Sequence, residues 1–577
     1  MDQGAAEDTS GLASLTKHRS GVWPLVSGAE MQALDRLTID GHGISGQLLM
    51  ENAGRSLMRP VLELHASSLR REGMIRIFCG AGNNGGDGFV LARTLFSEGI
   101  RAETILIGDA ASLPHDAALN WARLDEIGAS RHVVDPLDDG FDWASLLSHT
   151  SVAVDALFGI GLTREIRGGF ARLVESLCEE RRAGLRILSV DIPSGIDAST
   201  GGVLGIAVRA DRTLTISLPK LGLALEPGRS HAGEIEVTRI GIDDPDPERL
   251  PRTELWNVRA AARVFPERRR DGHKGVFGRV LAIAGSKGLM GAGALCARAS
   301  LRAGSGLVTL AHPVGVTDEN ASLLDEVMTV EAAVTEAGGF ARAAEKDLVE
   351  WAATRDVVAL GPGLGRGPET GDLVVRLLRT LDQPIVLDAD GLYPMGDDLT
   401  VLRDRAAMGS TAKTILTPHP GEAARLLGVE AIDINADRLA SARGLAERSQ
   451  SVVILKGAGT VVAEPEGRAL IIPTGGPALA SGGTGDVLTG IVAALLGSGC
   501  PAFQAAALAA WWHGSSADRL DQGRAGFGVL ASEIADGLPD CATEMIRQLD
   551  SNDASFYGSI HGKADPDADL VLRFPGS

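Results

Sequence analysis

Short apolar runs alternate with helical stretches along most of this chain, and that alternation constrains the fold more than any other feature. Several of the runs end in loops rich in glycine or aspartate. The runs lie at residues 74–79, 102–107, 152–157, 185–190 and 212–217 in the first half, and at 279–284, 307–311, 356–360, 384–387, 412–416 and 451–455 in the second. Such runs are typical of buried parallel strands. The alternation predicts a doubly wound α/β architecture, in which ligands bind at the carboxyl ends of the strands.

A polar, proline-rich passage at residues 243–249 separates the two series of strands and predicts a linker. The halves do not repeat one another's motifs, so we interpret them as two different fused domains. A helical pattern begins at Ser27, where Met31, Leu34 and Leu37 recur on one apolar face. The predicted organisation is a flexible leader at residues 1–26, a first domain at 27–245, a second domain at 252–545 and a polar, poorly ordered tail at 546–577.

The acidic balance of the chain argues against some classes of partner. A net charge of −20 makes a broad electrostatic grip on nucleic acid or on an anionic membrane unfavourable. The five cysteines are far apart and form no Cys-x-x-Cys pair, which argues against a zinc site and fits a reducing cytoplasm. Residues 487–512 carry no charge, but the Gly- and Pro-containing segment 497–501 predicts two buried helices rather than a membrane span. The sequence is compatible with a homo-oligomer.

Polar, glycine-rich segments follow three predicted strands of the first half. Residues 80–88 read GAGNNGGDG, residues 154–164 read VDALFGIGLTR and residues 190–197 read VDIPSGID. The first segment contains the Gly-x-Gly-x-x-Gly fingerprint, but Glu103 falls inside the next strand and not at its end, where a Rossmann dehydrogenase needs an acid. Glycines here let the backbone approach a phosphate, and Asn and Asp offer oxygens to a cation or to sugar hydroxyls.

Three such strand ends can converge on one crevice and bring Asp155 close to Asp191. One of these carboxylates is then a candidate for proton transfer, and Arg164 is a candidate for contact with a phosphate. A helix N-cap after a strand explains each aspartate as well. The residues alone leave these interpretations open.

With the opening segment at residues 31–54, which contains LMENAG, these motifs resemble the NAD(P)H-hydrate epimerase family over residues 27–242. The resemblance implies a Rossmann-like doubly wound sheet of the YjeF N-terminal type, which interconverts the R and S hydrates at C6 of the nicotinamide ring. It also implies Asp191 as the acid/base group. The implied potassium ligands are Asn84, Asp155 and Ser194, and the implied substrate contacts are Asn83, Asn84, Gly85, Gly86, Asp87, Gly159, Ile160, Gly161, Leu162, Thr163, Arg164, Glu165 and Asp191.

The decisive motif of the second half is LASGGTGDVL at residues 479–488. Its glycines bring several backbone N–H groups together at the start of a helix, which makes an anion hole suited to a phosphoryl group in transfer. Asp486 is placed where a base accepts a proton from a substrate hydroxyl. A glycine loop that only caps a buried helix is the simpler alternative.

Four further segments with glycine or polar side chains follow strands of the second half. They are GPGLG at residues 361–365, LDAD at 387–390, TPHPGE at 417–422 and LKGAGT at 455–460. Lys456 and Thr460 offer a cation and a hydroxyl to a nucleotide, and two prolines fix the loop of His419. His419 taken alone is better explained as a structural histidine than as a ligand contact.

With HKG at residues 273–275 and GLMGA at 288–292, these motifs resemble the ribokinase-like fold, and specifically the ADP-dependent NAD(P)H-hydrate dehydratase family, over residues 252–541. The chain departs from the family at Tyr393, where Asn is usual, and at Leu289, where an aromatic is common. The implied nucleotide contacts are Lys456, Gly457, Ala458, Gly459, Thr460 and Gly485, and the implied substrate contacts are Ala292, Gly363, His419 and Asp486.

The resemblance implies that ADP, with magnesium, phosphorylates the C6 hydroxyl of the S hydrate. The lone pair of the ring nitrogen then expels phosphate, which leaves AMP, phosphate and NAD(P)H. One alternative is a ribokinase-like kinase for a small alcohol fused to a non-catalytic interaction module. A kinase releases a stable phosphorylated product, whereas a repair enzyme releases inorganic phosphate.

Overall fold

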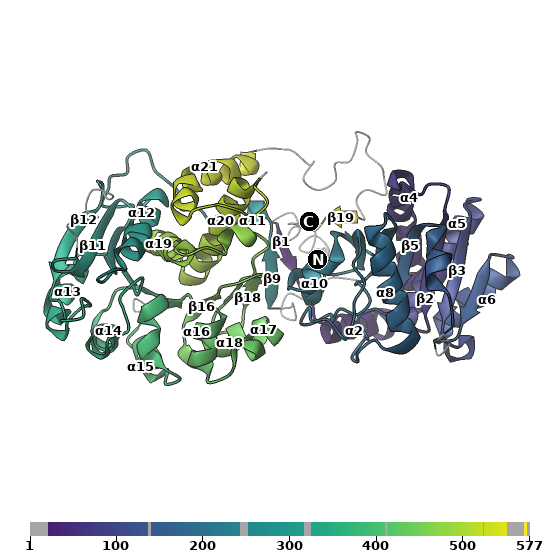
Figure 1. The fold of residues 1–577 in the computed structure, drawn as a ribbon, viewed down its shortest axis with the longest axis horizontal. Helices are drawn as coiled ribbons and strands as arrows, with labels where there is room; N and C mark the ends of the chain where they lie inside the picture. Colours follow the sequence, from purple (N-terminus) through teal and green to yellow (C-terminus); the bar gives the residue numbers. More distant parts are fainter. Residues whose placement is uncertain are drawn as a thin grey trace, which may run out of the picture. The chain divides into compact units, whose positions relative to one another are not determined.

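The computed structural model describes residues 21–136, 140–242, 252–316, 325–409, 413–522, 524–550 and 571–573. The chain divides into two compact units, which Figure 1 distinguishes by colour along the sequence. The N-terminal unit comprises Pro24–Pro251 with Asp553–Ser577, and the C-terminal unit comprises Arg252–Asn552 with Met1–Trp23. The linker predicted at residues 243–249 lies outside the described residues.

One sheet organises the N-terminal unit, with the strand order β19-β8-β7-β6-β5-β2-β3-β4. All neighbours are parallel except β19, which runs antiparallel to β8. Its strands are β2 (Met74–Gly80), β3 (Ala102–Ile107), β4 (Arg131–Val134), β5 (Thr150–Ala156), β6 (Arg186–Val190), β7 (Arg212–Ile216), β8 (Glu234–Thr238) and β19 (Val571–Arg573). The five strands predicted for this half are confirmed; β4, β8 and β19 are additional.

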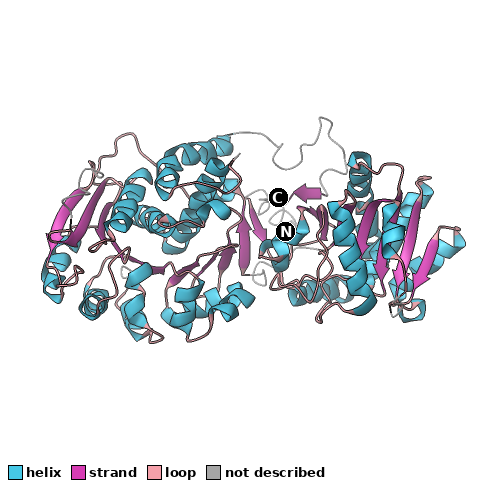
Figure 2. Cartoon of the chain, in the orientation of Figure 1, coloured by secondary structure: helices cyan, strands magenta, loops and turns pink. Residues whose placement is uncertain are grey.

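Helices cover both faces of this sheet (Figure 2). Alternate residues of β2 point to opposite faces, so Ile75 and Ile77 belong to one apolar cluster and Phe78 to another. The predicted helix at Ser27 is confirmed as α2, and Ser27 with Glu30 forms its capping box. The helices are α2 (Gly28–Arg36), η1 (Leu37–Gly41), α3 (Gly46–Ser56), α4 (Met58–Ser67), α5 (Asn83–Ser97), η2 (Ala110–Ser112), α6 (His115–Glu126), α7 (Trp143–Ser148), α8 (Gly168–Arg182), α9 (Leu221–Ala224) and α10 (Gly228–Ala232).

The sheet of the C-terminal unit has the order β1-β9-β18-β17-β16-β15-β14-β13-β10-β11-β12. It is parallel from β16 to β12, and β17 is antiparallel to both of its neighbours. Its strands are β1 (Val22–Pro24), β9 (Thr253–Trp256), β10 (Arg279–Ile283), β11 (Leu307–Pro313), β12 (Met328–Ala332), β13 (Val357–Leu360), β14 (Ile385–Leu387), β15 (Thr414–Leu416), β16 (Val452–Leu455), β17 (Val461–Ala463) and β18 (Ala469–Ile471). All six predicted strands of this half are confirmed.

The uncharged stretch at residues 487–512 forms two buried helices, as predicted, with the turn between Gly497 and Ala502. Among the described residues, no helix has both the length and the apolar composition to cross a membrane. The helices of this unit are α11 (Val258–Ala262), α12 (Met290–Arg302), η4 (Arg342–Ala344), α13 (Glu345–Ala352), α14 (Pro368–Thr380), η5 (Ala389–Gly391), η6 (Tyr393–Met395), α15 (Thr400–Ala407), α16 (Pro420–Leu427), α17 (Ala431–Ala436), α18 (Arg438–Ser449), η7 (Pro477–Leu479), α19 (Thr484–Gly497), α20 (Ala502–Asp521) and α21 (Ala531–Asp550).

Both ends of the chain differ from the sequence prediction. Residues 22–26, predicted as part of the leader, are structured, because β1 joins the sheet of the C-terminal unit and Leu25 is buried. Residues 546–550, predicted as part of the tail, belong to α21, and residues 571–573 form β19, which pairs with β8. Both strands pair with segments distant in sequence, so local composition gave no signal for them.

Candidate active sites

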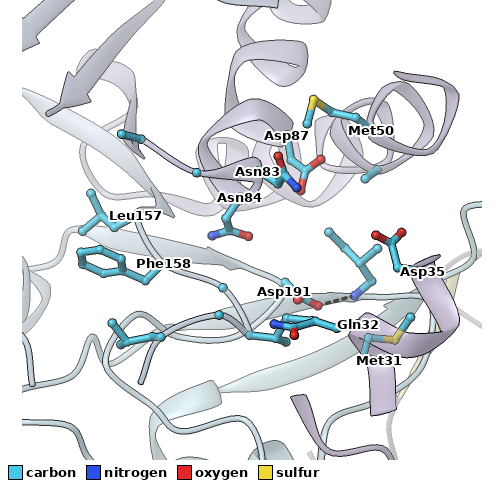
Figure 3. A pocket seen from close by; sticks show the side chains of 18 of the residues that line it. Met31, Gln32, Asp35, Met50, Asn83, Asn84, Asp87, Leu157, Phe158 and Asp191 are labelled. Carbon is cyan, nitrogen blue, oxygen red and sulfur yellow. Dashed lines mark hydrogen bonds between the residues drawn. The ribbon is translucent and has the colours of Figure 1, made fainter. Parts of the chain in front are cut away.

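A cavity of about 1150 Å³ lies in the N-terminal unit where β2, β5, β6 and β7 end (Figure 3). In the sheet order, β2 and β5 are neighbours whose connections lead to opposite sides, which is the point where ligands bind in such sheets. Most of the predicted substrate contacts line the cavity, namely Asn83, Asn84, Asp87, Gly159, Ile160, Gly161, Leu162, Thr163, Arg164, Glu165 and Asp191.

The segment at residues 80–88 is mostly helix, not the loop that its glycines suggested. Helix α5 begins at Asn83, three residues after β2 ends. A Cβ atom on Gly85 would lie 2.0 Å from the carbonyl oxygen of Gly80, and one on Gly86 would lie 2.5 Å from the methyl group of Met50. These two glycines therefore allow close packing of α5, and they are not among the residues that line the cavity.

Asp155 is fully buried at the end of β5, and its partners are hydroxyl and amide groups. Its Oδ1 accepts from the Ser194 hydroxyl at 2.5 Å, and its Oδ2 accepts from the Ser194 N–H at 2.9 Å and from the Ser189 hydroxyl at 2.8 Å. Burial raises the pKa of this carboxyl, and the hydrogen bonds oppose the rise. Nearby, the Asn84 side chain lies against Gly159, and its buried Nδ2 has no hydrogen-bond partner among the described residues.

Asp191 contacts a lysine that the sequence analysis missed. Lys220 Nζ donates to Asp191 Oδ1, to the Ile216 carbonyl oxygen at 2.6 Å and to the Thr215 hydroxyl at 3.2 Å. The lysine side chain is 1% exposed; burial lowers its pKa, and the charges of Asp191 and Asp87 oppose this. Asp191 itself adopts φ 67°, a conformation uncommon outside glycine. The sequence feature that could have identified this lysine is the pair Pro219-Lys220, which closely follows the predicted strand at residues 212–217.

In the C-terminal unit, strand ends bring an acid and a lysine to the N-terminus of α19. Lys456 Nζ lies 2.8 Å from Asp388 Oδ1, and the Thr489 hydroxyl donates to Asp388 Oδ2 at 2.7 Å. A Cβ on Gly485 would lie 3.2 Å from Lys456 Nζ, so two predicted nucleotide contacts are adjacent. Asp486 occupies the first turn of α19. Burial raises its pKa to about 7; the charge of Asp388 adds to the rise and Lys456 opposes it.

A buried arginine shapes the predicted nucleotide loop at residues 456–460. Arg438, the first residue of α18, donates to the carbonyl oxygens of Leu455 at 3.1 Å and Lys456 at 2.9 Å. A Cβ on Gly457, which has φ 136°, would lie 2.9 Å from its Nη2. Burial lowers the pKa of Arg438 to about 10, so it stays charged at neutral pH. Sequence reasoning missed this residue because a single arginine in a helix carries no signal.

Two of the predicted substrate contacts, Ala292 and Gly363, lie together: a Cβ on Gly363 would be 3.0 Å from that of Ala292. His419 has a structural role of its own, because its Nδ1 accepts from the Gly421 N–H at 3.1 Å and caps α16. Its backbone N–H donates to Glu422 Oε2 at 2.9 Å, and its half-exposed ring remains accessible. The described contacts do not join His419 to Asp486.

The two departures from the family pattern lie at the surface. Tyr393 is 44% exposed, and the guanidinium groups of Arg366 and Arg425 lie 5.0 and 4.5 Å from its ring centroid. Arg366 also bonds Asp390 at 2.9 Å. Leu289 is 47% exposed, and its carbonyl oxygen adjoins Gly363.

The two sites define a chain with two separate polar centres, each at the strand ends of an α/β sheet. A family described as YjeF-related protein N-terminus matches residues 46–222, and a family described as NAD(P)H-hydrate dehydratase matches residues 280–540.

Several curated relatives match over most of their length. The chain is 41% identical to the bifunctional NAD(P)H-hydrate repair enzyme Nnr of Moorella thermoacetica, over 92% of this chain and 99% of the relative. It is 36% identical to the same enzyme of Thermofilum pendens, over 91% and 97%. The chain therefore belongs to the family of bifunctional NAD(P)H-hydrate repair enzymes, with an epimerase unit and a dehydratase unit. The alternative of a small-alcohol kinase with a non-catalytic module is not favoured.

A solved structure is also similar to half of the chain. The ADP/ATP-dependent NAD(P)H-hydrate dehydratase of Bacillus subtilis, co-crystallized with ATP and Mg²⁺, is 30% identical to the chain with a TM-score of 0.43. That match covers 50% of this chain and 98% of the other.

Proposed function

We propose that the N-terminal unit interconverts the R and S hydrates of NADH and NADPH at C6, and that the C-terminal unit uses ADP to convert the S hydrate back to NAD(P)H. The observation that carries this division is the different chemistry of the two polar centres. The first has carboxyl groups around a large cavity, which suits proton transfer. The second has a lysine, an acid and a helix N-terminus together, which suits phosphoryl transfer.

In the epimerase unit, Asp191 is the proposed acid/base group. It lines the cavity, and its contacts with Lys220 and the Ile216 N–H orient the carboxylate. The substrate contacts are the cavity-lining residues of the segment 83–87 and of the segment 159–165. We expect both segments to surround the nicotinamide end of the hydrate.

A potassium ion is proposed at Asn84, Asp155 and Ser194. These residues fit a hard cation, because they offer oxygen ligands and because the buried Asp155 contacts no cationic side chain in the part of the chain that the structure describes. The ion would balance that charge and order the adjoining loop. Crystals grown with rubidium in place of potassium are expected to show an anomalous peak among these three side chains; water alone at that position would exclude the site.

In the dehydratase unit, Asp486 is the proposed base for the C6 hydroxyl, which becomes phosphorylated by ADP. Hydroxide is a poor leaving group, whereas phosphate is a good one. Lys456 and the loop through Thr460, with Gly485, are the proposed nucleotide contacts. Among the described residues, no group of three or more His, Cys, Asp or Glu side chains is placed to hold a metal ion. Magnesium is therefore expected to arrive with the ADP phosphates.

The five cysteines are all free, and three of them are buried. This supports a proposed location in a reducing compartment such as the cytoplasm. A homo-oligomer is compatible with the proposal, and neither nucleic acid nor a membrane is a proposed partner.

Mixed R and S hydrates, incubated with the full chain and followed at the absorbance of the reduced ring, test the function. With ADP, the wild-type chain is expected to consume both epimers and release AMP and phosphate. The Asp191→Ala variant should consume the S fraction and then slow to the spontaneous rate of epimerisation, because a fixed phosphoryl donor meets the hydroxyl on only one ring face. Accumulation of a stable phosphorylated alcohol from another substrate would instead support the kinase.

A further inference from the structure

Asp87 is the one cavity-lining carboxyl of the N-terminal unit that combines deep burial with no hydrogen-bond partner among the described residues. It lies in the second turn of α5 and is 9% exposed. Figure 3 shows its side chain directed into the cavity, on the opposite side from Asp191. Because the carboxyl lines the cavity and is not bonded to another described residue, a ligand in the cavity can reach it.

The charged groups around Asp87 come from four other elements or loops. Asp35 on α2, Asp191 after β6 and Lys220 after β7 interact with it electrostatically, and the thiol of Cys79 on β2 feels its charge. Lys220 is already bonded to Asp191. Lys220, the cation named as acting on Asp87, is therefore already bonded to another carboxylate, and the two other charges acting on Asp87 are acids.

The two aspartates therefore have different surroundings. Burial raises the pKa of Asp87 well above its ordinary value, and the charges of Asp191 and Asp35 raise it further, while Lys220 opposes them. A carboxyl whose pKa is raised keeps its proton to higher pH, which suits Asp87 to donate a proton, whereas the Asp191 carboxyl accepts a hydrogen bond from the Lys220 ammonium group. Two carboxyl groups of one site, one beside acids and one bonded to a lysine, are the usual arrangement of an acid and a base.

We infer that Asp87 is the general acid of the epimerase site and faces Asp191, its general base, across the bound ring. The inference rests on the proposed function and adds a catalytic role to a residue otherwise expected only to contact substrate.

The proposed reaction is balanced in protons and electrons. Asp87 protonates the C6 hydroxyl; the C6–O bond breaks, water leaves, and the lone pair of N1 forms an N1=C6 double bond. Water then adds to the opposite face of C6, and its proton passes to Asp191. The cycle leaves Asp87 ionised and Asp191 protonated, and exchange with solvent restores both. The cationic ring between these steps lies among carboxylates, which stabilise it.

The test is conversion of purified R hydrate to S hydrate by the full chain without nucleotide, followed by chromatography. Asp87→Asn keeps the size of the side chain but removes its acidic proton, so kcat should fall by about 100-fold or more with little change in KM. Glu98→Gln, the same change of charge at an exposed position that ends α5, should match the wild type. ADP-dependent dehydration of S hydrate and the melting temperature should be unchanged in both variants.

The pH profile separates an acid from a structural residue. Wild-type epimerisation should fall as pH rises through the pKa of Asp87, and this alkaline limb should be absent from the residual activity of Asp87→Asn. If Asp87→Asn is as active as the wild type, or keeps the alkaline limb, this inference is wrong while the proposed function stands. If the wild-type chain does not epimerise at all, the proposed function fails and the inference with it.

Discussion

In each unit, a lysine contacts an aspartate near the carboxyl ends of the sheet strands. The two pairs differ in how exposed the lysine side chain is. In the N-terminal unit, the Lys220 side chain is 1% exposed and is bonded to Asp191, a hydroxyl and a carbonyl. In the C-terminal unit, the Lys456 side chain is 21% exposed, whereas its partner Asp388 is 1% exposed. Lys220 is therefore enclosed by protein groups, whereas Lys456 remains accessible to a ligand.

This difference matches the chemistry of the two sites. Epimerisation moves protons, so its site needs a carboxylate held ionised and a second carboxyl kept neutral. Phosphoryl transfer moves negative charge, so its site needs accessible cations and N–H groups. A lysine–aspartate pair therefore suits proton transfer when its lysine is buried, and phosphate binding when its lysine is exposed to a ligand.

The sharpest test of this comparison is Asp486→Ala. Removal of the proposed base should lower dehydration of S hydrate by about 10²–10⁴-fold, while the full chain should still interconvert R and S hydrates at the wild-type rate. Spectrophotometric dehydration and chromatographic epimerisation assays on one preparation measure both. Near-normal dehydration by this variant would contradict the assignment, because the dehydratase site would then use a different base.

The two lysines should differ in their effect on stability. Lys220→Met leaves the Asp191 carboxylate buried without its cation and should lower the free energy of unfolding by about 3–5 kcal/mol. Lys456→Met should cost less, about 1–3 kcal/mol, because Asp388 keeps its bond to Thr489. Urea denaturation measures the change, and hydrogen exchange of β7 and β16 assigns it to a unit. Equal losses in the free energy of unfolding would contradict the difference in burial between the two lysines.

The two activities should depend on pH in opposite directions. The pKa of Asp486 is raised to about 7, and a base must be ionised, so kcat/KM for dehydration should fall about tenfold for each pH unit below that value. Asp388→Asn removes a charge that raises this pKa and should move the limb to lower pH. Rate profiles of both activities on one sample test this; a dehydration rate that falls only at high pH would contradict it.

The smallest effect is expected at Tyr393. Stacking of a guanidinium on an exposed ring contributes about 0.5–1 kcal/mol, so Tyr393→Asn should change KM for the S hydrate by about two- to fivefold through the loops of Arg366 and Arg425. Tyr393→Phe keeps the stacking and serves as the control. Steady-state kinetics on both would show whether this departure affects the dehydratase at all; epimerisation should not change.

Much of the fold was predictable because its signals are local. Every predicted strand is present, and the alternation of strand and helix predicted the parallel core of both sheets. The strands β1, β4, β8, β9, β12, β17, β18 and β19 were not predicted. The loops after β2, β5 and β6 do lie around one cavity, and Lys456 does lie beside Gly485. The loop expected at Asn83–Asp87 is helix, because glycines that often mark turns here allow α5 to pack against β2.

What the sequence determined by itself is the type of chemistry: apolar runs of strand length, and acids, amides and glycines where those runs end. Only the tertiary structure decided which of these groups act together. Lys220 gains its role from the adjacency of β6 and β7, and Arg438 gains its role from carbonyl oxygens that the fold brings around it. The protonation of Asp87 depends on burial and on which carboxylate the lysine reaches, and the places of β1 and β19 depend on pairing with remote strands. Burial and pairing are properties of the folded arrangement, because they depend on neighbours that are distant along the chain.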